Sequence, residues 1–587
     1  MDTLPRQALT PTLATSSAAG HTSHQRFWRR HCHLIVVIAV AFAIRLCFGL
    51  ATADTYDYDE FVLLLLGRDF AHGAVPYRDF MFFHPPGELV LLRLLEPLTS
   101  AWWPIARLVM MAIDTATAGL VWYVGTLLYD RRSAFVAGLL YAFNPVALIS
   151  AVRVGQDPVL TFLGVAGLAI LLSKRSHTAA ALAGASLGLA IWFKYPAAVL
   201  LPVYVLAAPR RSPAIILGAG AALAAVFAPF LPYAHQLYDQ TVTFQRTRWL
   251  MPLDQRIGTT LIFWLGLNAL AVAAMVRQRP HRPWLLAGFA LGGVFVLSSQ
   301  VYYHYFVPAV PFAALIAAPF VARFARSAFL ALAGFLIAAV IAWAALIDLG
   351  GSAPAYVTAA HLSSIQPTIQ VLRASTDPGD YVLADRYEYS YLANRQALAH
   401  YFWNVGVLKD ATYLELRLPA AAAVILSYGA SSGYPSGFVG YLDHHYPSIR
   451  TRANTIWLLP RRRVISASST TDDQSMHKTP QRHALGQMVG ARGFEPPTSA
   501  SRTLRATKLR HAPKNPPDWN YSLSEPRIVA RSAMSGQRNE ATHRAVHSSR
   551  PHSSSNQRFL AFSASLSSGV RSNCCSASSG RLTKRLR

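Results

Sequence analysis

Residues 104–128 read PIARLVMMAIDTATAGLVWYVGTLL, and Arg107 and Asp114 are the only charged residues in this run. A run of about 20 mainly apolar residues is long enough to cross a 30 Å hydrocarbon layer as a helix. Because lipid offers no partners to backbone polar groups, such a run must close its own hydrogen bonds. A charge near the middle of a span is costly, so we expect Asp114 to be paired, with Arg45 or Arg107 favoured over a proton-relay role.

Similar apolar runs lie on both sides of this one. They are at 33–50, 133–151, 157–173, 178–193, 195–208, 213–232, 258–276, 283–299, 303–321 and 327–349. The chain is 53% hydrophobic and only 14% charged, whereas a soluble domain has about one quarter of its residues charged. This excludes a cytosolic globular enzyme and a disordered scaffold. The sequence predicts an all-α polytopic membrane protein with about eleven transmembrane helices in residues 33–350.

Basic residues mark alternate connections between these runs. They are Arg26, Arg29 and Arg30, Arg131 and Arg132, Lys174 and Arg175, Arg210 and Arg211, Arg277, Arg279 and Arg282, and Arg323 and Arg326. Since Lys and Arg accumulate in cytoplasmic loops, residues 1–32 are predicted to be cytoplasmic and everything after residue 350 to be outside the plasma (inner) membrane. Ala51-Thr52-Ala53 resembles a signal-peptidase site, so a cleaved first run is the alternative, although Arg45 within the run argues against it.

Two segments follow the predicted bundle. Residues 351–460 are predicted to form a small extracytoplasmic α/β domain, with strands at 381–385, 421–425 and 455–459. Residues 461–587 carry 22 Lys and Arg against six Asp and Glu, and their Ser-, Arg- and Pro-rich composition predicts disorder. Within them, 488–513 resembles the translated antisense strand of a transfer-RNA gene, which indicates non-native read-through. A basic arm for nucleic acid or anionic lipid is the alternative, but the topology places it on the wrong side, so no nucleic-acid partner is predicted.

The first predicted outer loop, residues 51–103, gathers ionisable groups in an otherwise charge-poor chain. They are Asp54, Asp57, Asp59, Glu60, Asp69, Asp79, His84 and Glu88. We expect a short helix over 61–72 that lies on the membrane, and a second from Gly87 to Leu95 that Pro85-Pro86 opens. A carboxylate at this boundary can take a proton from an incoming hydroxyl. The alternative is a solvated loop whose acids only keep it out of the bilayer.

Further polar residues follow later spans on the same predicted side. They are Arg153 with Asp157, Lys194, Arg246 with Arg248, and His304 with Tyr305. Cations and hydrogen-bond donors of this kind can stabilise the charge on a leaving phosphate. They can act together only if the bundle brings its outer ends into contact.

Several motifs together resemble the glycosyltransferase C superfamily. They are YDYDEF (56–61), GAVPYRDF (73–80), HPPGELVLL (84–92) and the segments 141–164, 192–203 and 304–318. The arrangement is similar to bacterial membrane glycosyltransferases related to protein O-mannosyltransferases and to the aminoarabinose transferases of lipid A. Gly87 stands where some relatives have leucine.

The resemblance implies sugar transfer from a polyprenyl-phosphate carrier to an extracytoplasmic acceptor. It implies catalytic roles for Asp59, the base or organising acid, with Glu60 beside it, and for Asp157 as a second acid. Lys194 would meet the carrier phosphate, and His84 either contributes to the site or caps its loop. The full set of predicted substrate-binding residues is His84, Arg153, Lys194, His304 and Tyr305.

The sequence therefore predicts an inverting membrane glycosyltransferase in which Asp59 removes the acceptor proton while the sugar carbon is attacked in line. Its predicted partners are the donor, a cell-envelope glycan, lipid or protein acceptor, and the bilayer. A membrane transporter or lipid-sugar flippase without bond-making chemistry is the alternative, and a non-catalytic scaffold is a third. A carboxylate-lined site can hold Mg²⁺ or Mn²⁺, but no metal-specific spacing is visible.

Overall fold

The computed structural model describes residues 18–247, 250–278, 282–324, 360–398, 418–426, 437–451 and 454–460. The predictions for residues 327–349 and for the segment 461–587 lie outside these ranges. Everything below concerns the first of two compact units of the chain, Met1–Arg492.

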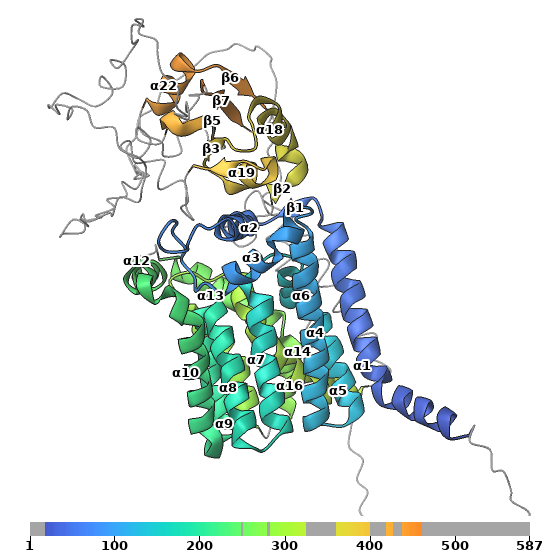
Figure 1. Ribbon diagram of the computed structural model, residues 1–587. Coiled ribbons are helices and arrows are strands. Elements are labelled where there is room, and N and C mark those ends of the chain that lie inside the picture. Colours follow the sequence, from blue (N-terminus) through green and yellow to red (C-terminus); the bar gives the residue numbers. More distant parts are fainter. Residues whose placement is uncertain are drawn as a thin grey trace, which may run out of the picture. The chain divides into compact units, whose positions relative to one another are not determined.

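A bundle of helices forms most of this unit (Figure 1). Its main members are α1 (Ala18–Ala51), α4 (Ile105–Leu128), α5 (Arg131–Ala142), α6 (Pro145–Ala151), α7 (Gln156–Ser173), α8 (His177–Phe193), α9 (Leu201–Ala207), α10 (Ser212–Phe227), α14 (Ala269–Arg277), α15 (Pro283–Val294) and α16 (Val310–Arg323). Helices form in every predicted run that the structure describes. Side chains from most of them share one large buried cluster.

Five helices in the described part of the chain are long and apolar enough to cross a membrane, or seven when each of two bent pairs is counted as one span. The bent pairs are α5 with α6, at 56°, and Leu253–Gly266 with α14, at 67°. The first bend follows from Asn144-Pro145: Asn144 caps α6 with its side chain, and Pro145 begins that helix. The structure thus confirms a mostly helical, multi-pass architecture, while the count of eleven spans stays a prediction.

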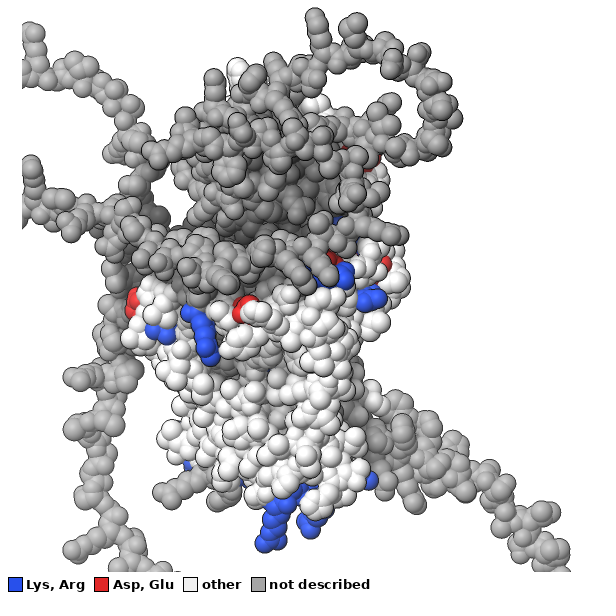
Figure 2. All heavy atoms as spheres, turned by 60° about the vertical axis from the view of Figure 1, so that its left-hand side comes forward, with Lys and Arg blue, Asp and Glu red and all other residues white. Residues whose placement is uncertain are grey.

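The bundle has a basic end and an opposite end that carries the acidic loop. Arg131, Arg132, Lys174, Arg175 and Arg210 are exposed in the connections between α4 and α5, α7 and α8, and α9 and α10. Figure 1 shows these connections at the end away from α2 and α3. On the face seen in Figure 2, uncharged surface covers the middle of the bundle; Lys and Arg project at its lower end, whereas residues of both charges lie at its upper end.

The acidic loop folds into two short helices, α2 (Tyr58–Ala71) and α3 (Gly87–Thr99). Asp57 and Glu60 form a reciprocal capping box at the start of α2, which explains why the helix begins there. The side chains of 61–66 are buried in a protein cluster that includes residues of α3 and α19 (Tyr387–Ala393), so protein covers this apolar face. That this helix lies on the membrane stays a prediction.

A five-stranded mixed sheet follows the bundle, in the order β4-β3-β5-β7-β6. Its strands are β3 (Tyr381–Ala384), β4 (Gln396–Ala397), β5 (Ala421–Leu426), β6 (Ser448–Arg450) and β7 (Thr455–Leu458), accompanied by α18 (Leu362–Ser375), α19 and α22 (Phe438–His445). Strands form at all three predicted places, whereas the short edge strands β4 and β6 were missed.

Main-chain pairing ties this sheet region to the acidic loop. Strand β1 (Thr55–Tyr56) pairs antiparallel with β2 (Ala360–His361). The Asp54 side chain accepts hydrogen bonds from the Ser363 amide at 2.8 Å and from its hydroxyl at 2.7 Å. The Tyr56 hydroxyl donates to the buried Glu388 carboxylate at 2.8 Å. The start of α2 is therefore held from the sheet side within a few residues of Asp59.

Asp114 is paired as the sequence predicted, and its partner is Arg45. The Arg45 Nε donates to Asp114 Oδ2 at 2.6 Å, Tyr141 donates its hydroxyl to Oδ1 at 2.5 Å, and both charged side chains are fully buried. This network joins α1 to α4 and α5. Removal of α1 would leave Asp114 without its cation, which supports retention of the first helix.

We predict that Arg45→Met strongly destabilises the protein, because it leaves a buried carboxylate without its positive partner. Loss of one member of such a pair costs about 3–5 kcal/mol. Thermal unfolding of the purified full chain in lipid nanodiscs measures the effect. The matched control is the double variant Arg45→Met with Asp114→Leu, which removes both charges and should recover much of the loss. Equal unfolding temperatures for wild type and the single variant would contradict this assignment.

Candidate functional site

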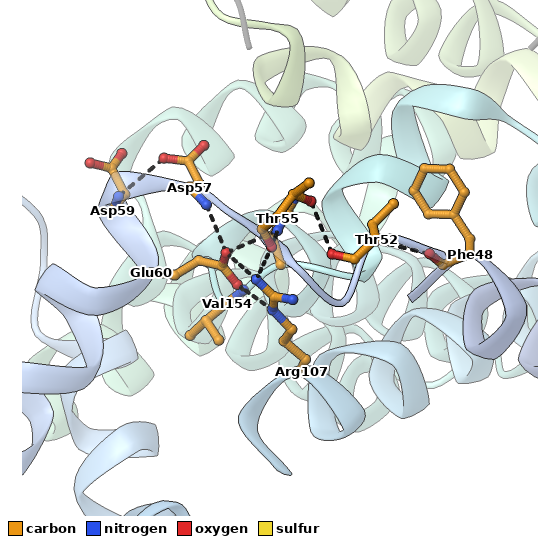
Figure 3. Close-up of polar contacts among 9 residues, drawn as sticks. Phe48, Thr52, Thr55, Asp57, Asp59, Glu60, Arg107 and Val154 are labelled. Atoms are coloured by element: carbon orange, nitrogen blue, oxygen red, sulfur yellow. Dashed lines mark hydrogen bonds and ion pairs between the residues drawn. The ribbon is translucent and has the colours of Figure 1, made fainter. Parts of the chain in front are cut away.

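Glu60 lies at the centre of a buried ion-pair cluster (Figure 3). Arg107 of α4 donates to it twice, from Nε at 2.8 Å and from Nη2 at 2.7 Å. The amides of Val154 and Asp57 donate at 3.0 and 2.9 Å. Burial alone would raise the pKa of Glu60, but the charges of Arg107 and Arg153 hold it below its ordinary value. A carboxylate that is ionised and saturated in this way positions other groups and is poorly suited to accept a substrate proton.

Arg153 belongs to the same cluster and does not stand free to bind substrate. Its guanidinium donates to the carbonyl of Thr55, to the Thr55 hydroxyl at 2.6 Å and to Glu60 at 3.3 Å. Arg107 donates to the same Thr55 carbonyl at 2.8 Å. The two arginines thus fix the strand that leads into α2.

Asp57 and Asp59 lie on the other side of this strand. Figure 3 shows both carboxylates directed away from Arg107. Asp57 accepts a hydrogen bond from the Asp59 amide at 3.1 Å, and burial raises its pKa despite this bond. Asp59 is half-buried. Asp57 is half-buried as well, so both acids differ from Glu60, which is enclosed.

A second charged cluster joins Asp157 and Lys194. Asp157 is in the first turn of α7, and Lys194 ends α8. The Lys194 Nζ lies 3.0 and 3.1 Å from the two oxygens of Asp157 and 4.8 Å from the centre of the Tyr305 ring. Both charged side chains are at least nine-tenths buried. The structure thus brings together three of the polar residues that follow or begin predicted spans on the same side, which the sequence alone did not show.

This pair borders a pocket with about 400 Å³ of space, part of which is open to the outside. Asp157, Lys194 and Tyr305 supply its polar side chains. Its other lining residues are apolar or glycine: Leu160, Pro196, Ala197, Val199, Leu200, Leu291, Gly292, Phe295, Pro308 and Ala309. The lining therefore combines an apolar wall with one charged pair.

Glu88, which the sequence analysis did not select as a site residue, is in the first turn of α3. Its side chain is fully buried, and neither carboxylate oxygen has a hydrogen-bond partner among the described residues. Burial and then the charge of Asp157 raise its pKa to about 8, while Lys194 acts in the opposite direction. Since this acid belongs to a short helix in a charge-rich loop, no sequence pattern distinguished it from its solvated neighbours.

Gly87 permits this arrangement. A Cβ atom at this position would lie 2.8 Å from the carbonyl oxygen of Trp192 and 3.1 Å from the Cα of Phe193. The first turn of α3 therefore packs directly on the backbone at the end of α8, next to Lys194. The departure from leucine at this position is explained by the close approach of these two segments.

The two charged clusters adjoin each other at the segment between α6 and α7, where Arg153 of the first cluster and Asp157 of the second are four residues apart. His304 stacks on Tyr302 with 5.7 Å between ring centres, and its ring lies 5.0 Å from that of Tyr305, which packs against the Lys194 ammonium. His304 and Tyr305 thus belong with the Lys194 cluster.

His84 is held differently. Its carbonyl oxygen accepts a hydrogen bond from the Tyr77 hydroxyl at 2.7 Å, and its ring lies against Phe82. It is not among the residues that line the described pocket. These contacts favour the loop-capping alternative for His84.

Residues 233–257, which connect two of the predicted apolar runs and contain Arg246 and Arg248, pack on the acidic loop. Gln240 donates to the Tyr77 carbonyl at 3.0 Å and accepts from the Phe82 amide at 2.9 Å, and Gln245 donates to the Phe83 carbonyl at 3.1 Å. Within the described residues, Arg246 forms no ion pair with the acids of either charged cluster, and Arg248 lies outside those residues.

A metal centre is not apparent in the described ranges, where no group of three or more His, Cys, Asp or Glu side chains is arranged to hold an ion. No step below depends on a metal.

These features define a class of protein. It is a polytopic helical membrane protein, and the end of its bundle opposite the basic connections holds an acidic loop, a Lys–Asp pair and an apolar pocket. A family model described as dolichyl-phosphate-mannose-protein mannosyltransferase matches residues 83–233. No curated protein sequence gives a significant match to the chain.

Two solved structures of ArnT from Cupriavidus metallidurans share the fold. The one bound to undecaprenyl phosphate is 14% identical, with a TM-score of 0.50, and the match covers 73% of this chain and 98% of that chain. The apo structure is 15% identical, with a TM-score of 0.50 and coverage of 75% and 98%. The family-model match confirms the resemblance to mannosyltransferases over residues 83–233, and the ArnT structures show a shared fold.

We predict that Gly87→Ala displaces α3 from α8 and destabilises the protein by about 1–3 kcal/mol, because the backbone of α8 cannot yield to the added methyl group. The matched control is Gly155→Ala, since a Cβ there meets nothing within 4 Å. Thermal unfolding of both variants measures the difference. An unchanged unfolding temperature in Gly87→Ala would show that the close packing is not required.

Proposed function

We propose that this protein transfers a sugar from a polyprenyl-phosphate carrier to a hydroxyl of a cell-envelope acceptor, with inversion at the anomeric carbon. The observation that carries the proposal is the apolar pocket bounded by Lys194 and Asp157 beside the acidic loop. The shared fold with a structure of ArnT bound to undecaprenyl phosphate supports this class of donor. The family model matched by residues 83–233 supports the reaction type.

In this proposal the carrier's hydrocarbon chain occupies the apolar side of the pocket, and its phosphate approaches the ammonium of Lys194. A buried ammonium stabilises an anion more strongly than the same group in water, because the local dielectric constant is low. Asp157 holds the ammonium in place and Tyr305 packs against it. Lys194 therefore supplies the charge that a departing phosphate requires, and Asp157 acts by positioning it.

Asp59 is assigned as the general base. It takes the proton of the acceptor hydroxyl while the acceptor oxygen attacks the sugar carbon opposite the departing phosphate, and this single displacement inverts that carbon. Glu60, Arg107 and Arg153 hold the start of α2, so they set the direction of Asp59 without touching the substrate. This assigns to Glu60 a positioning role in place of the catalytic role that the sequence analysis gave it.

The proposed orientation follows from the two ends of the bundle. The basic connections lie at one end, and the acidic loop lies at the other. Since basic connections favour the cytoplasm, the site and the sheet region are extracytoplasmic in this proposal. An acceptor in the cell envelope then reaches Asp59 from outside, while the donor enters from the bilayer.

We predict that Asp59→Asn abolishes transfer while leaving the amount and unfolding temperature of the protein unchanged, because the amide cannot accept the acceptor proton. Loss of a general base typically costs about 10²–10⁴-fold in rate. The measurement is mass analysis of envelope lipids and glycans from a deletion strain that carries each variant.

Asp79→Asn is the matched control, since Asp79 is an exposed acid of the same loop, ion-paired with Arg78. Near-normal product in the Asp59→Asn strain would remove the assigned base. Uptake of a labelled lipid-linked sugar into vesicles without any glycosylated product would favour a flippase.

We predict that Lys194→Met weakens binding of undecaprenyl phosphate by about 10–100-fold, because a charge-assisted contact contributes about 1.5–3 kcal/mol. Binding to the purified full chain in nanodiscs measures this. Lys174→Met, an exposed lysine at the basic end, is the control and should bind as the wild type does. Equal affinity of the Lys194→Met variant would place the carrier phosphate elsewhere.

A further inference from the structure

A buried acid of the sheet region contacts the segment that leads into Asp59. Tyr56 is fully buried, and its hydroxyl donates a hydrogen bond to Glu388 Oε1 at 2.8 Å. The Nε of Arg386 lies 2.8 Å from the same oxygen, and Glu388 is itself fully buried. One carboxylate oxygen of α19 thus joins the acidic loop to the sheet region.

A second contact joins the same two parts of the chain. The guanidinium carbon of Arg386 lies 5.5 Å from the centre of the Tyr58 ring. The rings of Tyr58 and Tyr387 stack with 6.5 Å between their centres and 23° between their planes. The start of α19 therefore contacts two residues, Tyr56 and Tyr58, that lie three positions and one position before Asp59.

These contacts act where other restraints on the loop end. On the bundle side, Arg107 and Arg153 donate to the carbonyl and the hydroxyl of Thr55, at 2.8 and 2.6 Å. Main-chain pairing with β2 covers only Thr55 and Tyr56. Helix α2 begins two residues later, with Asp59 in its first turn. The contacts with α19 therefore influence how the start of this helix is directed.

The hydrogen bond of Tyr56 gives direction more than cohesion. The rings of Tyr56 and Phe61 already pack edge to face, with 5.1 Å between their centres. Apolar side chains in place of a buried ion pair commonly give equal or greater stability. A hydrogen bond, in contrast, forms only over a narrow range of distances and angles. The bond to Glu388 thus fixes an orientation that apolar packing alone leaves open.

We infer that Tyr56 and Glu388 are positioning residues for the transfer reaction, which direct Asp59 from the sheet side without touching the substrate. This inference rests on the proposed function. A general base must come within about 2.6–3.2 Å of the hydroxyl whose proton it takes. Neither Tyr56 nor Glu388 lines the pocket beside Lys194. Loss of their contact should therefore slow the transfer and leave the affinity for the carrier unchanged.

The test compares Tyr56→Phe with the wild type, since this change removes the hydroxyl and keeps the ring. The first measurement is the rate of product formation per amount of protein. It is followed by mass analysis of envelope lipids and glycans at short times after induction in a deletion strain. The rate should fall about tenfold or more, because a misplacement of 1 Å can cost about 10²-fold. The second measurement is binding of undecaprenyl phosphate to the full chain in nanodiscs, which should not change.

Tyr389→Phe is the matched control. Tyr389 is a buried tyrosine of the same helix α19, and its hydroxyl donates to Asn454 Oδ1 at 3.1 Å within the sheet region. This variant should lose a similar amount of thermal stability but keep the wild-type rate. Equal losses of rate in Tyr56→Phe and Tyr389→Phe would overturn the inference, because they would reflect stability alone. A wild-type rate in Tyr56→Phe, or weaker carrier binding by it, would overturn the inference as well.

A second set of variants tests the acid. Glu388→Gln keeps an oxygen that can accept the hydrogen bond from Tyr56, whereas Glu388→Ala does not, so the glutamine should retain more activity. Adding Tyr56→Phe to Glu388→Ala should cause no further loss of rate, since both changes remove the same contact. A further loss as large as that of Tyr56→Phe alone would overturn the inference.

The comparison of Tyr56→Phe with Tyr389→Phe decides the matter if Glu388→Ala does not fold. The proposed function fails separately from this inference. A wild type that neither binds undecaprenyl phosphate nor restores a glycosylated product to the deletion strain would overturn the proposed function itself.

Discussion

The buried carboxylate of Glu60 is the interaction on which the geometry of the site depends. It joins four separate parts of the chain: the strand before α2, α2 itself, Arg107 of α4 and the segment Arg153–Val154 after α6. A buried carboxylate is stable only when its charge and lone pairs are satisfied. These segments therefore cannot separate without leaving an uncompensated charge in an apolar environment. Asp59 is the neighbour of Glu60 in the chain, so its backbone is held in place as well.

Much of the bundle could be predicted from sequence because lipid imposes a simple rule. Apolar runs must become helices, and a charge within one of them requires a partner, which is why Arg45 or Arg107 could be named for Asp114; the structure decides for Arg45. The rule fixes which residues are buried in the membrane but not where a helix bends. Two predicted runs are each divided into two helices, beside Asn144 and beside Asn268, although the hydropathy of each run continues across the break.

The site was predicted less completely, for a physical reason. The residues Asp157, Lys194 and Tyr305 could be selected because each follows or begins a span on the same predicted side. Their contact with one another could not be predicted. The roles of Asp59 and Glu60 could not be separated, since neighbouring residues on a helix point in different directions and only the surrounding segments decide which is enclosed. Glu88 could not be identified because its burial arises from Gly87 packing on α8, a contact between distant parts of the chain.

The sheet region adds a second constraint on the same loop. Strand pairing at Thr55–Tyr56 and the bond from Tyr56 to Glu388 hold the segment before α2 from one side, while Arg107 and Arg153 hold it from the other. Arg386 extends this contact, with its guanidinium carbon 5.5 Å from the centre of the Tyr58 ring. A loop held from both sides loses little freedom when substrate binds, so less of the binding free energy is spent on ordering it. The sheet region thus contributes to catalysis in the proposed mechanism through rigidity at Asp59, whatever acceptor it meets.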